Sequence, residues 1–342
     1  MELDLKVVEI RLRSGMHLGE REGWLEGTGV FPLSDTLFSA FCNGYRLLYG
    51  EEELDALLQA FLDGPPPFRL SSGFPKWKGL YFFPAPLNQI AAEKDVKNIR
   101  WIEKAGWERL LRGEAIEEVL KASSVQYIPK PGPNCQAKET EEPPEPWKIL
   151  ETPRVGLDRT NNHPGERYFQ FGQVHFYPDA SYFFLADVAS EDVWERLKAV
   201  WRLLADEGIG GDRSVGKGLY HSPSFAALRL SLPDRAENQA LLSLFYPSPS
   251  ETGIIGEGYY EFIERKGYLY SPASQGLRRN AVRLFKTGSV FPSSRPLRGR
   301  LMDVTPEIFT RHRVYRYGIA LSVPCRLRGE SHAGSHAESH VG

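Results

Sequence analysis

The chain has 342 residues, of which 41% are hydrophobic and 25% charged, so it can form two globular domains with a sizeable core and is not a disordered chain. No apolar run approaches the ~18 residues of a membrane span, and the first residues lack the basic and apolar regions of a signal peptide. The three cysteines, Cys42, Cys135 and Cys325, are far apart and lack metal-binding spacing. These features predict a cytoplasmic protein with no metal or cofactor.

The net charge of −2 conceals a segregation of charge along the chain. The stretch from Arg278 to Arg328 holds twelve basic residues and only two acidic ones, so the remainder carries about −12. Eleven of the twelve are arginines, whose planar guanidinium groups suit phosphates and stack on bases. This bias indicates a polyanionic partner for the C-terminal part.

Apolar periodicity predicts the elements of the N-terminal part in turn. They are a strand over 3–13, helices over about 35–48 and 51–62, extended segments over 68–75 and 79–84, and helical structure over 93–121. Ser34 or Asp35 is a suitable N-cap for the first helix. The strand changes phase at Val7 and Val8, which indicates either a bulge or burial on both faces.

A proline-rich stretch divides the chain, with seven prolines between Pro129 and Pro153, and predicts a linker or long exposed loop. A β-hairpin is expected next, with arms at 155–159 and 168–171 around a polar turn. A helix capped by Ser190 follows. Strands are then expected over 225–232, 240–246, 259–270, 281–291 and 315–323, and the last fourteen residues read as a mobile tail.

The stretch from Gly208 to Gly218 holds five glycines, one arginine and one lysine. Glycines permit positive φ angles and close approach of the backbone to a ligand, and successive N–H groups in such a turn form a concave nest for an anion. Arg213 and Lys217 add positive charge beside it. The order helix, loop, strand fits neither a Walker loop nor a dinucleotide fingerprint. A phosphate-binding loop and a tight surface turn both remain open on this pattern alone.

Few residues are candidates for catalysis or metal binding. His17 follows the first strand and could act as an acid or base in RNA cleavage, although no partner residue is evident. His332, His336 and His340 share a helical spacing that resembles a metal site, but their Gly- and Ser-containing surroundings favour a disordered tail. No carboxylate pair or catalytic triad order is found.

Several motifs together resemble one family, the RAMP proteins of CRISPR effector complexes. The first helix motif, Pro32 to Cys42, resembles RAMP proteins in general, and the loop from Gly208 to Gly218 matches their glycine-rich loop. Further motifs are similar to the subunit that holds the 5′ handle of the guide RNA in type III-A (Csm) complexes: Ser71 to Pro75, Tyr81 to Leu87, and Leu157 to Asn161 with Phe169 to Phe176. The segment from Lys286 to Phe291 resembles a further glycine turn of the second half.

This resemblance implies an α+β fold of two ferredoxin-like (RRM-like) domains with an inserted β-hairpin thumb. The first domain would span 1–153, the hairpin and second domain 154–328, and the tail 329–342. The partners would be the CRISPR RNA handle, the large polymerase-domain subunit and the backbone RAMP subunit, with target RNA nearby. The residues expected to contact RNA are Gly210, Gly211, Arg213, Ser214, Gly216, Lys217, Gly218, Arg159, Asn161, His163, Arg167, His17, Ser34, Arg283 and Lys286.

Three hypotheses for function follow. The first, which the resemblance implies, is a non-catalytic RNA-binding subunit that caps the base of a type III-A effector. The second is a metal-independent endoribonuclease that processes CRISPR precursor RNA, with His17 as acid or base. The third is a scaffold whose basic part docks onto a protein.

Overall fold

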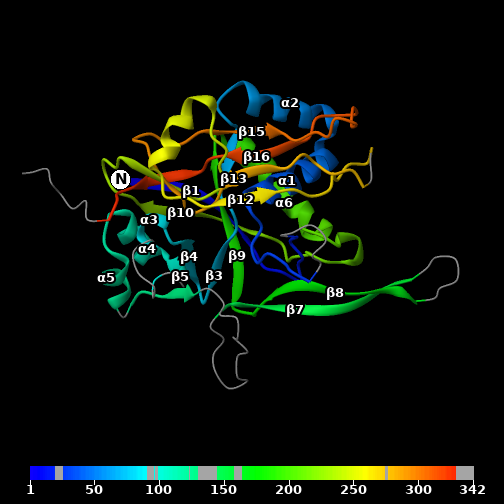
Figure 1. Cartoon of the computed structure of the whole chain (residues 1–342), viewed down its shortest axis with the longest axis horizontal. Coiled ribbons are helices and arrows are strands. Elements are labelled where there is room, and N and C mark those ends of the chain that lie inside the picture. Colours follow the sequence, from blue (N-terminus) through cyan, green and yellow to red (C-terminus); the bar gives the residue numbers. More distant parts are fainter. Residues whose placement is uncertain are drawn as a thin grey trace, which may run out of the picture.

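Figure 1 shows the computed structural model of the chain, which describes residues 1–19, 26–90, 96, 99–122, 124–129, 145–157, 164–273 and 276–328, the side chains of 129, 157 and 164–167 excepted. Its centre is an eight-stranded antiparallel sheet in the order β10-β1-β9-β3-β4-β5-β6, with β2 also paired to β9. The strands are β1 (Glu2–Ile10), β2 (Phe68–Leu70), β3 (Phe74–Trp77), β4 (Leu80–Pro84), β5 (Ile99–Glu103), β6 (Tyr127–Pro129), β9 (Ala180–Val188) and β10 (Ser224–Ser231).

The sheet forms because its central strands are apolar on both faces. In β9 the five consecutive residues from Tyr182 to Ala186 are completely buried, which is typical of a strand with both faces covered. In β1, Val7 and Val8 are both buried and the register with β10 is continuous through them. The phase change in the sequence therefore reflects burial on both faces rather than a bulge.

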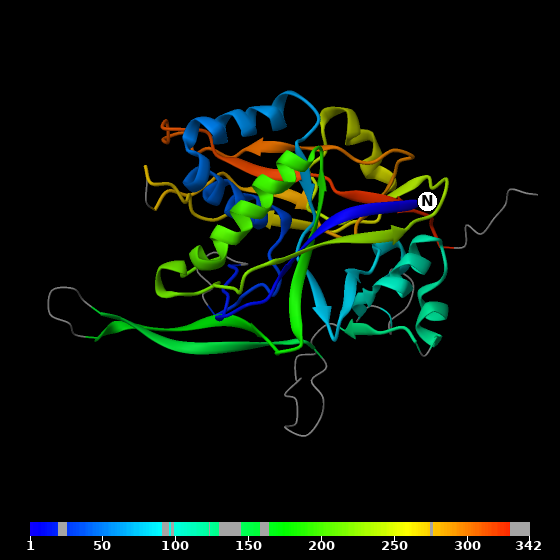
Figure 2. The same ribbon diagram turned by 180° about the vertical axis from the view of Figure 1, so that it is seen from behind.

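The helices cover this sheet and join it to the C-terminal part. They are α1 (Ser34–Tyr49), α2 (Glu51–Asp63), α3 (Leu87–Ile90), α4 (Lys104–Leu111), α5 (Ile116–Lys121) and α6 (Glu191–Glu207), with 3-10 segments η2 (Arg213–Val215) and η3 (Pro249–Glu257). The α1 and α6 helices pack against each other, with Gly44 of α1 facing Val200 and Leu204 of α6. Figure 2 shows α6 from behind, along the same side of the sheet as α1.

The C-terminal part contains small antiparallel sheets instead of one large sheet. One is three-stranded, with β11 (Asn238–Leu241) between β14 (Val290–Pro292) and β17 (Ser322–Cys325). Two are pairs, β12 (Phe262–Arg265) with β13 (Val282–Phe285) and β15 (Gly299–Asp303) with β16 (Tyr315–Ile319). Some of their inner residues join the core of the large sheet, since Tyr317 packs on Phe38 of α1 with ring centroids 4.7 Å apart. Others, among them Leu241, Phe285 and Phe291, form a second, smaller buried cluster.

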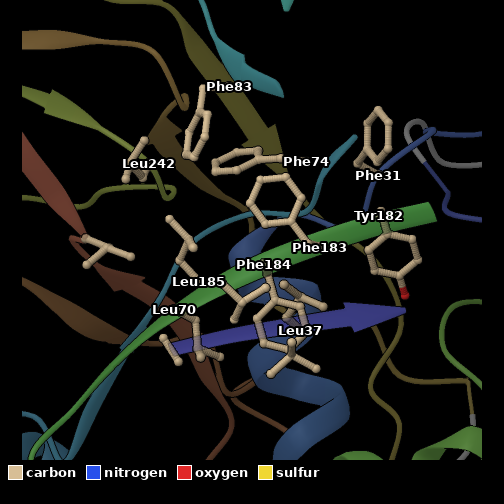
Figure 3. Packing of buried hydrophobic residues seen from close by; sticks show 14 of the residues in the cluster. Phe31, Leu37, Leu70, Phe74, Phe83, Tyr182, Phe183, Phe184, Leu185 and Leu242 are labelled. Carbon is tan, nitrogen blue, oxygen red and sulfur yellow. The ribbon is translucent and has the colours of Figure 1, made fainter. Parts of the chain in front are cut away.

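Aromatic residues dominate the core. Figure 3 shows Phe74, Phe83 and Phe183 gathered on one side of β9, and Phe184 on the other side near Leu37 of α1. The ring centroids of Phe74 and Phe183 lie 5.7 Å apart with the rings edge to face, which is a preferred geometry for aromatic pairs. This packing fixes β9 at the centre of the sheet, between β1 and β3.

A long β-hairpin projects from this body (Figure 1). Its strands, β7 (Trp147–Leu157) and β8 (Pro164–Phe176), pair antiparallel from Trp147 opposite Phe176 to Leu157 opposite Pro164. At its foot Met16 bridges to Val174, which fixes the hairpin to the loop that follows β1. The predicted hairpin is therefore confirmed, and it is longer than the sequence indicated.

The α+β class predicted from the sequence is confirmed, whereas the count of two ferredoxin-like domains remains a prediction. The central sheet takes strands from both sides of the proposed boundary at 153 and 154, which lies within β7. Two local predictions are wrong. The segment 93–121 contains the strand β5 as well as helices, and residues 147–153 of the predicted linker belong to β7.

Two further observations limit the kinds of site in the described part of the chain. Within it, no group of three or more histidine, cysteine, aspartate or glutamate side chains is arranged to hold a metal ion. None of its helices is both long enough and apolar enough to span a bilayer. The tail histidines His332, His336 and His340 and the cysteine Cys135 lie outside the described residues.

Candidate nucleic-acid interface

The glycine loop, which we define as Gly208 to Gly218, is delivered by α6. Ser190 caps this helix, with its Oγ accepting the N–H of Val193 at 3.3 Å, as the sequence predicts. The helix ends at Gly208, where φ is +78° and the N–H donates to Leu204 O at 2.9 Å. Only glycine adopts such a backbone without strain, so the helix stops here and the chain turns back toward β1.

Two of the glycines are required by close contacts. The N–H of Gly218 donates to Gly15 O at 2.9 Å, and a Cβ on Gly218 would lie 1.9 Å from Ile209 O. A Cβ on Gly210 would lie 2.3 Å from His17 O, and φ is positive at both positions. The loop is thereby tied both to itself and to the segment after β1, so its shape is fixed.

The centre of the loop presents unbonded N–H groups. Asp212 has a left-handed backbone, and the short turn η2 begins at the next residue. The N–H groups of Val215, Gly216 and Lys217 donate within the loop. Those of Arg213 and Ser214 have no acceptor among the described residues, and Ser214 is exposed. Two successive free N–H groups in a turn of this kind form a concave site for an anion.

Charged side chains surround these N–H groups. Arg213 lies over the ring of Tyr270, with Cζ 4.5 Å from the ring centroid. Asp212 pairs with Arg154 of β7, which in turn lies over the ring of Phe171 at 4.3 Å. Because Arg154 offsets the charge of Asp212, the loop keeps the positive charge of Arg213 and Lys217. The hairpin foot and the glycine loop are in direct contact through this ion pair.

Two lysines, Lys217 of the glycine loop and Lys148 of β7, lie close to His175 of β8. Burial, followed by the nearby ammonium groups of Lys217 and Lys148, lowers the pKa of His175 from its usual value. Neither lysine has an ion-pair partner in the described part of the chain. Positive charge is therefore concentrated where the loop meets the hairpin, which favours a bound anion there.

The side chain of His17 is buried inside the protein and does not lie at the surface. Its side chain is only 7% exposed, its Nδ1 lies 2.8 Å from Gly172 O, and its ring lies 4.4 Å from that of Phe171. Its carbonyl oxygen accepts the N–H of Gly211 at 2.8 Å. The structure thus corrects the prediction that its imidazole lies against RNA, because the ring is enclosed where the hairpin meets the loop.

Ser34 also requires a correction. Its side chain is completely buried, and its Oγ accepts the N–H of Leu244 at 3.0 Å. The N-cap position of α1 is Leu33, without a side-chain cap bond. Ser34 therefore holds α1 against the C-terminal part, and its hydroxyl is available neither as a helix cap nor for RNA.

The remaining predicted residues are spread over two regions. Arg159, Asn161 and His163 lie outside the described residues, as does the side chain of Arg167. In the C-terminal part, Lys286 pairs with Glu261 at 2.9 Å, and the exposed Arg283 stands opposite Glu264 across the β12–β13 pair. The structure therefore brings together only the glycine loop members, with Gly210, Gly211, Gly216, Gly218, Ser214, Arg213 and Lys217 on one short turn.

Sequence reasoning missed four residues at this site, Arg154, Tyr270, Lys148 and His175. Tyr270 lies more than fifty positions beyond the loop and reaches it only through the fold. Lys148 lies in the stretch that the prolines marked as a linker, although its β-pairing with His175 gives it a fixed place. No sequence signal identifies them, because their positions depend on long-range contacts.

Comparisons with known proteins agree with the resemblance predicted from the sequence. Residues 234–325 match the family described as the CRISPR Csm4 C-terminal domain. The chain is 25% identical to a protein named CRISPR system Cms protein Csm4 from Methanocaldococcus jannaschii, with 89% of each chain covered. It is 23% identical to a protein of the same name from Thermococcus onnurineus, with 86% of this chain and 92% of the relative covered.

Solved structures show the same fold. One is the crystal structure of a Csm1–Csm4 cassette in complex with pppApA, with a TM-score of 0.60, 17% identity and coverage of 96% of this chain and 100% of that chain. Another is a Csm3–Csm4 subcomplex of the type III-A CRISPR-Cas interference complex, with a TM-score of 0.60, 20% identity and coverage of 93% and 99%. The predicted resemblance is confirmed.

Proposed function

We propose that this chain, which resembles the Csm4 proteins along nearly its whole length, is the Csm4 subunit of a type III-A CRISPR effector complex. In that complex it would hold the repeat-derived 5′ handle of the CRISPR RNA and join the large subunit to the backbone. Its relatives bear the name Csm4, and chains of the same fold occur with Csm1 and with Csm3. Those two proteins would be its direct partners.

The observation that carries the proposal is the glycine loop with its unbonded N–H groups and free positive charge. A backbone phosphate would accept from the N–H groups of Arg213 and Ser214. Arg213 and Lys217 would supply the charge that makes binding strong. The bases of the single-stranded RNA would remain free to form hydrogen bonds along their edges. The adjacent hairpin would press against the guide where the handle ends.

The proposed role is binding rather than catalysis. The endoribonuclease alternative needs an acid or base that reaches the scissile phosphate. His17, its candidate, is enclosed by Phe171 and Gly172. We expect the purified chain to leave repeat RNA intact in EDTA. Specific cleavage that is lost in His17→Ala would instead establish the enzyme.

The binding proposal is tested with the double variant Arg213→Ala/Lys217→Ala and a short fluorescent single-stranded RNA. Loss of two phosphate contacts should make the slope of log K against log salt shallower by about 1.4, at roughly 0.7 per contact. As a matched control, Arg229→Ala and Lys6→Ala remove equal charge from ion pairs with Asp4 and Glu191. Unchanged affinity and slope in the loop variant would contradict the assignment.

A second measurement addresses the assembly. Native mass spectrometry of the complex purified through this chain should report the large subunit, the backbone subunit and bound RNA. If the assembled complex contains RNA but no RNA crosslinks to this chain, the chain is a scaffold and its basic part binds protein.

A further inference from the structure

A buried ion cluster lies at the first turn of α1. Asp35 is 2% exposed, and its carboxylate receives both Nε and Nη2 of Arg265, at 2.8 and 3.1 Å. Nη1 of Arg316, itself 3% exposed, donates to the same carboxylate at 2.5 Å. The two arginines come from β12 and β16, so the cluster joins α1 to two of the small sheets (Figure 1).

A third guanidinium enlarges this cluster without a carboxylate of its own. Arg279 is half-buried beside Arg316, Arg265 and Asp35. Burial, and then the charge of Arg316, lower the pKa of Arg279 to about 10, so the group stays charged at neutral pH. Its Nε is buried and has no hydrogen-bond acceptor in the described part of the chain, and the same is true of Nε of Arg316. We refer to Asp35, Arg265, Arg279 and Arg316 as the arginine cluster.

The charge of the cluster does not balance. Three guanidinium groups share one carboxylate, and an unpaired buried charge or unbonded donor costs free energy. Arg265 and Arg316 are held by several bonds, including Arg316 Nη2 to Lys266 O at 2.9 Å. Arg279 has no comparable partner, so its excess charge suits an anion that approaches from the partly exposed side.

Exposed aromatic rings lie on the same stretch of chain. Arg279 pairs with Gly267 through its N–H at 3.0 Å, and the neighbouring Tyr268 bridges to Arg278. Tyr268 is 55% exposed and Tyr270 is 66% exposed. Arg213 of the glycine loop packs over the ring of Tyr270, so the arginine cluster and the loop border one surface.

Cations and exposed rings in alternation suit single-stranded nucleic acid, whose phosphates and bases alternate in the same way. An acidic protein segment could pair with the arginines, but it does not offer the regular succession of charged groups and flat rings that a nucleic-acid strand offers. The surface therefore favours RNA over a protein ligand.

From this arrangement we infer a second RNA-binding element, in which Arg279 holds a backbone phosphate and Tyr268 and Tyr270 stack on bases. This inference rests on the proposed function, because it places the same strand on both the glycine loop and the arginine cluster. It adds residues that lie far from the loop in sequence, and it extends the path of the RNA from the glycine loop across the C-terminal part.

The substitution Arg279→Gln tests the phosphate contact with two readouts. RNA affinity should fall about tenfold or more, as for a lost charged hydrogen bond, and the salt slope should become shallower by about 0.7. The melting temperature of the RNA-free variant should stay the same or rise, since a repulsive charge is removed. A falling melting temperature with unchanged affinity would make Arg279 a structural residue and overturn the inference. Arg229→Gln, which removes an arginine paired with Asp4, is the control.

The substitutions Tyr268→Leu and Tyr270→Leu test stacking separately from charge. Each should weaken binding about fivefold to a hundredfold, the range for a lost base–aromatic stack, while the salt slope remains that of the unmodified chain. Unchanged affinity in both variants would contradict the stacking role.

The outcomes separate this inference from the proposed function. If the unmodified chain does not bind the RNA, the proposed function fails. If it binds, and only Arg213→Ala/Lys217→Ala weakens binding, the glycine loop stands and the second element is refuted. If Arg279→Gln binds RNA normally but loses a subunit from the purified complex, the ligand of Arg279 is protein and the RNA assignment is wrong.

Discussion

The glycine loop and the arginine cluster are both positively charged, but they are built in different ways. In the loop, backbone turns at glycines place N–H groups and two cations at the surface. In the cluster, Arg265 and Arg316 lie inside the protein and are held by one buried carboxylate, that of Asp35. The difference shows that surface charge needs only backbone shape, whereas buried charge needs a counter-charge that fixes several elements at once.

The largest expected effect concerns the cluster. Asp35→Asn leaves two buried guanidinium groups without their partner and should lower the free energy of unfolding by about 3–5 kcal/mol. Chemical denaturation measures this change. Asp4→Asn, at an exposed pair with Arg229, should change stability by less than about 1 kcal/mol. Equal effects in the two variants would show that the cluster does not hold the fold together.

The pH dependence of stability gives a second test of the cluster. Burial opposes ionisation of Asp35, but Arg265 and Arg316 outweigh it and hold the pKa of the carboxyl below its usual value. Its contribution is therefore fully present above the unfolded pKa of about 3.9 and is lost only as the pH falls through the lower folded value. The stability difference between the unmodified chain and Asp35→Asn should stay constant from neutral pH down to about pH 4. A difference that shrinks already near pH 6 would contradict the lowered pKa.

For the loop, the test is a pair of glycine substitutions. Gly218→Ala combines a positive φ with a clash against Ile209 O and should cost about 3 kcal/mol or more. Gly216→Ala has a positive φ, but its Cβ would make only an ordinary van der Waals contact with Leu219, and the substitution should cost about 1–2 kcal/mol. Thermal unfolding of the two variants measures the difference. Equal costs would mean that the loop does not pack as described.

A smaller effect concerns the contact between loop and hairpin. Arg154→Leu, Asp212→Asn and the double variant form a thermodynamic cycle across one partly exposed ion pair. We expect a coupling free energy of about 1 kcal/mol. A coupling of zero would indicate that the hairpin foot and the glycine loop are held only by the backbone contacts around His17.

The smallest effect is electrostatic. Lys217 is one of two cations that, after burial, lower the pKa of His175. Lys217→Ala should therefore raise that pKa, which a histidine NMR titration measures directly. Glu195→Ala, on the exposed face of α6, is the control and should leave the titration unchanged. An unchanged pKa of His175 in the lysine variant would show that the charge of Lys217 does not act on His175.

The two regions also differ in how far the sequence predicts them. The glycine loop, the helix that delivers it and the hairpin have local signals, namely glycines, a serine cap and turn residues. The arginine cluster has none, because Asp35 and Arg316 are separated by 281 positions. The same long-range packing explains the errors at Ser34, whose hydroxyl bonds to Leu244, and at β5, whose pairing with β4 overrides local helical propensity.

RNA–protein crosslinking on the effector complex purified through this chain tests the central claim most directly. Peptides that cover the glycine loop should carry crosslinked nucleotides, and those crosslinks should decrease in Arg213→Ala/Lys217→Ala while the complex still assembles. An assembled, RNA-containing complex with no crosslink on the glycine loop would contradict the account.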